Sequence, residues 1–194
     1  MKIEDITFDH FMSLPSSIRK QIINHPEMLA VMVKKNLNVH RFEHSVSVAE
    51  CAEKLASRWH VDPKKAYIAG LLHDCTKGFP ESFHDEYFRY YDPDKISYPE
   101  GVKHSFSAKY YLKEKLNFHD KDILNAIYNH TICCSRDKLS LILFISDKRE
   151  PLREIEDNVM ELAYTDLYEA YGLLYNDVER YLNERNERFI KNSL

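Results

Sequence analysis

Hydrophobic positions spaced three or four residues apart run through most of this 194-residue chain. The clearest example is "RFEHSVSVAECAEKLASRW" (41–59), which predicts one long helix. Its apolar positions at helical spacing are Val48, Ala52, Leu55 and Trp59. His44 lies one turn before Val48 and shares its face, so we expect the imidazole to point into the protein.

A second helix is expected from "DPKKAYIAGLLHD" (62–74). Asp62 is a favourable N-cap residue, and Pro63 suits the first helical position. Small residues at Ala66, Ala69 and Gly70 form a stripe that ends at His73. Because small side chains let helices approach closely, this stripe favours a site where several side chains converge.

The remaining patterns are also helical. Residues 16–36 carry two short helical patterns broken at Pro26. Gly78 and Pro80 are expected to end the helix that begins near residue 62. An aromatic amphipathic stretch at 80–91 is followed by a loop at 92–103. Further helices are expected at 104–116, 120–130, 137–148, 154–164 and 166–190. With no strand pattern and four glycines in the whole chain, the predicted fold class is all-α.

Composition narrows the class of protein. A length of 194 residues with 44% hydrophobic and 12% aromatic residues is typical of one globular domain with a sizeable core. The net charge of −4 gives no general attraction to a nucleic acid polymer, so an anionic ligand would need local cations or a metal. No apolar run approaches about 18 residues, which predicts no membrane span.

The N-terminal stretch lacks the basic-then-apolar layout of a signal peptide. The cysteines, which form no CxxC pair, are Cys51, Cys75, Cys133 and Cys134. We therefore expect a cytoplasmic protein with reduced thiols that serve mainly in packing.

Six histidine and aspartate side chains lie at the ends or on the inward faces of the predicted helices. His104 opens one predicted helix, His130 closes another, and Asp147 follows the apolar run "LSLILFIS" (139–146). An ionised carboxylate after so buried a helix is costly unless a cation neutralises it. The candidate metal ligands are His44, His73, Asp74, His104, His130 and Asp147.

Four imidazoles and two carboxylates suit Fe, Mn or Zn better than Mg or Ca. Six ligands exceed the need of one catalytic ion, and they fit two ions that share Asp74. Any single inward histidine is more often a satisfied core residue, so the prediction depends on the whole set. We expect the other histidines to lie in loops or polar contexts and to need no function: His10, His25, His40, His60, His84 and His119.

The order His44, His73-Asp74, Asp147 resembles the signature of the HD superfamily of metal-dependent phosphohydrolases. Over about residues 28–190 the chain resembles the bacterial YqeK-type branch, which comprises symmetrical diadenosine tetraphosphate (Ap4A) hydrolases. The stretches that carry the resemblance are "RFEHSVSVAECAEKLA" (41–56), "AGLLHDCTK" (69–77), "KHSFSA" (103–108), "AIYNHT" (126–131), "SDKREPLR" (146–153) and "ELAYTDLYEA" (161–170).

The resemblance implies an HD-domain helical bundle over 28–194, with the metal site between its central helices. Residues 1–27 fall outside the resemblance, and we expect them to form a helical extension. The resemblance also implies two transition-metal ions, with iron expected and manganese or zinc as alternatives. The ligands of one ion would be His44, His73, Asp74 and Asp147. Those of the other would be His104 and His130, with Asp74 bridging and orienting the nucleophile. The implied reaction splits Ap4A into two ADP.

A tetraphosphate brings about four negative charges that two ions do not offset alone. Lys77, three residues beyond Asp74, is the best candidate for a catalytic phosphate contact. Other candidate phosphate-binding residues are Arg41, Lys103, Arg136 and Arg153. An aromatic ring is expected to stack on adenine, and Phe79, Phe83 and Phe106 lie near the motifs.

The chain departs from the family pattern in ways that leave the exact nucleotide open. Ser105-Phe106 stands where Gly-Pro is common, and Ile132-Cys133-Cys134 follows His130-Thr131 where Gly-Arg is common. The alternatives are another HD-type nucleotide phosphohydrolase and a nucleotide-sensing module without strong activity. "LPSSIRKQI" (14–22) is similar to the closing segment of nicotinate-nucleotide adenylyltransferases, but we favour an ordinary helical extension. The sequence does not fix the oligomeric state, and a homodimer is the one assembly we consider.

Overall fold

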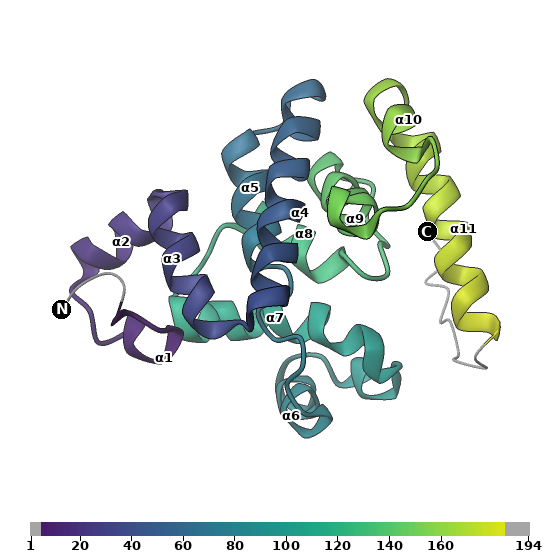
Figure 1. Ribbon diagram of the computed structural model, residues 1–194. Coiled ribbons are helices and arrows are strands. Elements are labelled where there is room, and N and C mark those ends of the chain that lie inside the picture. Colours follow the sequence, from purple (N-terminus) through teal and green to yellow (C-terminus); the bar gives the residue numbers. More distant parts are fainter. Residues whose placement is uncertain (1–4, 185–194) are drawn as a thin grey trace.

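The structure is a computed structural model that describes residues 5–184, and every regular element in that range is helical (Figure 1). The predicted all-α class is confirmed. The α-helices are α1 (Phe8–Phe11), α2 (Ser16–Asn24), α3 (Pro26–Asn36), α4 (Val39–Arg58), α5 (Pro63–Leu72), α6 (Glu81–Tyr91), α7 (Glu100–Leu116), α8 (Lys121–Asn129), α9 (Lys138–Arg149), α10 (Val159–Thr165) and α11 (Leu167–Glu184). Two short 3-10 helices are η2 (Pro93–Ser97) and η3 (Pro151–Arg153).

Side-chain caps define where several helices begin. The Asp62 carboxylate accepts hydrogen bonds from the backbone amides of Lys64 and Lys65 at the start of α5. Asp120 and Asp137 cap α8 and α9 in the same way. Each cap satisfies backbone N–H groups that have no partner inside the helix, which fixes the helix ends that carry the site.

Helices α4 and α5 form the central pair, and α8 and α9 pack beside them (Figure 1). The two axes come so close that a Cβ atom added to Gly70 would lie 2.4 Å from the Cα atom of Ala49. Only glycine fits at that crossing. The stripe of small residues seen in the sequence therefore does bring α4 and α5 into close contact.

Two predicted helices begin elsewhere than expected. Helix α7 begins at Glu100 rather than His104, because the extended Pro99 ends the preceding loop and His104 falls in the second turn. Helix α10 begins at Val159 rather than at residue 154, because η3 ends in Glu154 with the left-handed φ of 50°. The last residues of the helix expected at 166–190 lie outside the described range.

The first three helices pack on the same core as the central ones. Phe8, Phe11 and Ile22 are fully buried or nearly so, and they belong to one hydrophobic cluster with residues of α4, α5 and α9. Helix α3 runs through residue 27, while the domain boundary expected there stays a prediction. None of the helices in the range 5–184 combines the length and apolarity needed to cross a bilayer.

Candidate metal centre

The six candidate ligands converge between the central helices, and all six side chains are buried. His44 comes from α4, His73 and Asp74 follow directly after α5, and His104 lies in α7. His130 ends α8, and Asp147 lies in the last turns of α9. Five elements far apart in the chain therefore contribute to one polar cluster inside an apolar core.

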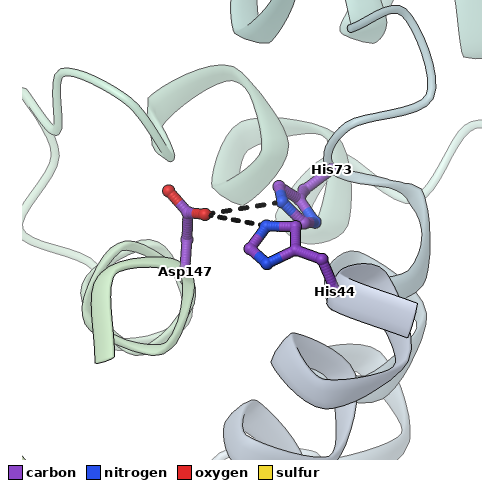
Figure 2. A group of neighbouring side chains, drawn as sticks. All are labelled: His44, His73 and Asp147. Carbon is purple, nitrogen blue, oxygen red and sulfur yellow. Dashed lines mark ion pairs between the residues drawn. The ribbon is translucent and has the colours of Figure 1, made fainter. Parts of the chain in front are cut away.

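One group of ligands surrounds Asp147. Its Oδ1 atom lies 3.2 Å from Nε2 of His44 and 3.6 Å from Nε2 of His73. Figure 2 shows both imidazole rings turned toward this carboxylate across the gap between α4 and α9. One donor atom from each of the three residues lies within 4.8 Å of the other two, a spacing that a single metal ion can span.

The Asp74 carboxylate faces both sides of the cluster. Its Oδ1 atom lies 3.2 Å from Nε2 of His104 and 3.4 Å from Nε2 of His130. Its Oδ2 atom lies 3.6 Å from Nε2 of His73 and 3.9 Å from Nε2 of His44. Because each oxygen addresses a different pair of histidines, this carboxylate has the placement that a shared ligand requires.

Backbone carbonyls orient two of the rings. The Nδ1 atom of His73 lies 2.7 Å from the carbonyl oxygen of Gly70, and that of His130 lies 2.7 Å from the carbonyl oxygen of Ile127. A carbonyl oxygen only accepts, so Nδ1 donates and Nε2 keeps its lone pair. Both carbonyls lie in the last turn of their helices, α5 and α8, and here they aim each Nε2 into the cluster.

Three buried polar atoms of the cluster form no hydrogen bond of acceptable geometry with any residue in the range 5–184: His44 Nε2, His73 Nε2 and Asp74 Oδ1. Leaving a buried polar atom in that state costs about 1–3 kcal/mol. A divalent transition-metal ion bonds to imidazole nitrogen and carboxylate oxygen, so it would satisfy all three atoms. The residues present therefore fit a metal site.

For four of the six candidate ligands, burial and neighbouring charges favour the protonation state that binds a metal ion: neutral for the two histidines and ionised for the two aspartates. Burial lowers the pKa of His104 to about 3 and also lowers the pKa of His130, so both rings are neutral at pH 7. Burial raises the pKa of Asp74, but the adjacent His73 and its other histidine partners outweigh it and hold that pKa well below its usual range. Asp147 behaves likewise, with Lys148 the largest favourable influence.

The pKa of His73 shifts in the opposite direction to that of His104 and His130. Burial lowers its pKa, but the carboxylates of Asp74 and Asp147 outweigh burial and raise it. A metal cation at Nε2 would compete with protonation of that nitrogen.

Two arginines stand at the edge of the cluster. Arg41 Nη1 donates to Asp74 Oδ2 at 2.6 Å, and Arg153 Nη2 donates to Asp147 Oδ1 at 3.1 Å. Both line a cavity of about 460 Å³ whose other walls are His40, Glu43, His44, Glu150, Leu152 and Ile155. This cavity opens beside the cluster, and its lining carries two arginines and two glutamates.

The lysines expected to bind phosphate have different surroundings. Lys77 Nζ lies 3.3 Å from His104 Nε2, at the edge of the cluster. Lys103 is buried, and its ammonium group pairs with Glu81 and Asp85 at 2.7 Å each. Successive helical residues point about 100° apart, so Lys103 faces α6 while His104 faces the cluster. This placement disfavours Lys103 as a phosphate contact. The other candidate, Arg136, is exposed in the loop between α8 and α9.

The aromatic candidates near the motifs pack with other rings. Phe79 and Phe83 lie edge to face, with their centroids 4.6 Å apart. Phe106 is buried in a smaller hydrophobic cluster.

No cysteine in the described range forms a disulfide, and burial raises the pKa of the Cys133 thiol to about 12, in agreement with a packing role.

Sequence reasoning assigned no role to two charged residues of the cluster. Glu150 is 2% exposed, and its Oε1 atom lies 3.1 Å from Nδ1 of His44. Lys148 Nζ donates to the carbonyl oxygen of His130 at 3.1 Å and lies 3.5 Å from Asp147 Oδ2. Both belong to a run of charges that resembles a solvated helix end. The available signal was their position directly after Asp147.

Comparisons with known proteins agree with this geometry. The family model described as the HD domain matches residues 41–171. A solved structure from Clostridium acetobutylicum, described as a predicted HD superfamily hydrolase involved in NAD metabolism, superposes with a TM-score of 0.75. It is 27% identical in sequence, and the match covers 91% of this chain and 90% of that one.

Two curated relatives are similar over most of this chain. The Bacillus subtilis protein named bis(5'-nucleosyl)-tetraphosphatase, symmetrical, is 32% identical, with 85% of this chain and 91% of that protein covered. The Mycoplasma genitalium protein named probable nicotinate-nucleotide adenylyltransferase/Ap4A hydrolase is 31% identical over 88% of this chain. The chain spans about half the length of that relative, since the match covers 51% of it.

Proposed function

The chain belongs to the HD domain family, and from this premise we propose that it hydrolyses diadenosine tetraphosphate symmetrically into two ADP. The observation that carries the proposal is the position of Asp74, whose two oxygens face two different pairs of histidines. The names of the curated relatives that match most of this chain support the same substrate. Cleavage is symmetrical when water adds across the central P–O–P linkage.

We propose two ligand sets that share Asp74. One consists of His44, His73 and Asp147, and the other of His104 and His130. Imidazole and carboxylate ligands suit iron, manganese and zinc, of which we favour iron. When bound, a pair of such ions supplies a nucleophilic water at neutral pH and offsets phosphate charge.

The chain's own side chains bind and orient the substrate. Arg41 and Arg153 line the 460 Å³ cavity beside the cluster, which lies within the size range of small-molecule sites. Each guanidinium pairs with a ligand carboxylate through one edge. A guanidinium carries five N–H donors, so the remaining donors can bind phosphate oxygens that enter the cavity.

Lys77 and Asp74 act closest to the bond that breaks. Lys77 Nζ lies beside His104, where an ammonium group stabilises negative charge that develops on the phosphates. Asp74 is placed to orient the attacking water. The leaving ADP departs through a phosphate oxygen, which is a stable anion at neutral pH and needs little protonation.

Product analysis tests this proposal. The purified protein is incubated with diadenosine tetraphosphate, and the nucleotides are separated by ion-exchange chromatography. We expect ADP as the only product, in two equivalents per substrate. ATP and AMP in equal amounts would mean asymmetric cleavage and would contradict the proposal, as would intact substrate after incubation with Fe²⁺, Mn²⁺ and Zn²⁺ in turn.

A further inference from the structure

Glu150 is a buried carboxylate that lies behind a proposed metal ligand rather than among the ligands. It follows α9 and caps η3, where its Oε2 atom accepts a hydrogen bond from the backbone N–H of Leu152 at 2.7 Å. Its Oε1 atom lies 3.1 Å from Nδ1 of His44. The backbone of η3 thus fixes one oxygen, and the other is left for a single histidine.

This contact determines the tautomer of His44. A carboxylate only accepts hydrogen bonds, so Nδ1 of His44 must donate, and Nε2 must present its lone pair to the cluster. The comparable contacts of His73 and His130 go to neutral carbonyl oxygens. Within residues 5–184, Glu150 is therefore the negatively charged partner of a histidine whose Nε2 faces the proposed metal site.

The charge of Glu150 is weakly compensated. No Lys or Arg nitrogen of the described residues lies within ion-pair distance of its carboxylate. The titratable side chain that contacts it is His44. Burying a carboxylate without a paired cation is costly. A cation on the far side of the imidazole would offset that cost, because a carboxylate–histidine–metal chain transmits the attraction through the ring.

We propose that Glu150 is a positioning residue that makes the His44 side of the centre the tighter of the two metal sites. It fixes the Nε2 tautomer of His44 and holds that ring in the orientation in which Nε2 faces the metal site. His104 and His130 on the other side have no carboxylate in that outer position among the contacts of the described residues. The inference rests on the proposed two-metal function, which it deepens.

Titration of the metal-free protein with Mn²⁺ alone tests the inference. Free Mn²⁺ is followed by electron paramagnetic resonance, which yields stoichiometry and both dissociation constants without measuring activity. The variants are E150A, which removes both charge and acceptor, and E150Q, which keeps an amide oxygen able to accept from Nδ1. The matched control is E156Q, because Glu156 is exposed and its substitution makes the same change in net charge.

We expect the first dissociation constant to rise about 10- to 100-fold in E150A and less in E150Q, with the second nearly unchanged. E156Q should reproduce both wild-type constants. Wild-type constants in both E150 variants would overturn the inference. Equal weakening of both sites in E150Q would also overturn it, because Glu150 would then support the fold generally. Should E150A fail to fold, the near-isosteric E150Q decides alone.

Failure of the proposed function has a different signature. A wild-type protein that binds fewer than two Mn²⁺ ions, or that leaves the tetraphosphate intact, contradicts the function itself. A wild-type protein that binds two ions and yields ADP, with E150 variants that bind them equally well, contradicts only the role of Glu150.

Discussion

The Oδ1 atom of Asp74, which follows α5, lies 3.2 Å from Nε2 of His104, which lies in α7. The second oxygen of the same carboxylate faces His73 and His44. One side chain therefore links the two halves of the cluster. A change at this position is expected to affect both proposed metal sites together.

Replacing Asp74 with Asn keeps the shape of the side chain but removes its charge. We expect both ions and the hydrolytic activity to be lost, with activity reduced by more than the roughly 100-fold typical of outer-sphere changes. Inductively coupled plasma mass spectrometry gives the metal content of the same samples used for kinetics. D94N is the control, since Asp94 is exposed and its substitution makes the same change in net charge. Normal metal content in D74N would contradict the bridging role.

Replacing Lys77 with Ala removes an ammonium group at the edge of the cluster. A hydrogen bond to a charged group is worth about 1.5–3 kcal/mol, so kcat/KM for the tetraphosphate should fall roughly 10- to 100-fold. Metal content should stay at the wild-type level. K64A changes an exposed lysine and should leave both quantities unchanged. Loss of metal in K77A would instead show that Lys77 supports the ligands.

Replacing Gly70 with Ala tests the close approach of α4 and α5. The new Cβ atom would lie 2.4 Å from the Cα atom of Ala49, so the helices must separate, at a cost of about 1–3 kcal/mol. The control is G172A, whose added Cβ has open space within a helix and should stabilise the protein by up to about 1 kcal/mol. Urea unfolding measures both changes. Equal stability of G70A and wild type would contradict the crossing geometry.

His84 should make stability depend on pH. Burial lowers its pKa in the folded protein, and its Nδ1 atom lies 2.8 Å from Ser107 Oγ. The unfolded chain therefore takes up a proton near pH 6.5 that the folded protein does not, so acidification below that point destabilises the fold. Removing this histidine should reduce the slope of the free energy of unfolding against pH by up to about 1.4 kcal/mol per pH unit.

Urea unfolding of wild type and H84Q between pH 7.5 and 5 measures that slope. H119Q is the reference, because it removes an exposed histidine. His104 and His130 contribute in the same direction in all three proteins, so the difference between H84Q and the others isolates His84. Parallel pH profiles for all three would contradict the prediction.

Local signals predicted the parts of the fold that depend on local chemistry. The cap at Asp62 and the stripe ending at His73 set α5, and the apolar run before Asp147 indicated a buried helix. Convergence of the six candidate ligands followed from their shared position at helix ends and on inward faces, and the contacts show that these side chains meet.

The remaining features depend on geometry that the sequence does not display. The direction of Lys103 follows from where α7 begins, and Pro99 places that start one turn earlier than the polar loop indicated. The role of Glu150 depends on η3 folding back against α4 after Pro151. A run of charges such as 147–150 gives no local sign of which members become buried.

Anomalous diffraction from crystals of the protein grown with Mn²⁺ tests the two-ion centre most directly. We predict two peaks, one among His44, His73 and Asp147 and one beside His104 and His130, with a different oxygen of Asp74 contacting each. A single peak, or two peaks with Asp74 contacting only one, would contradict this prediction.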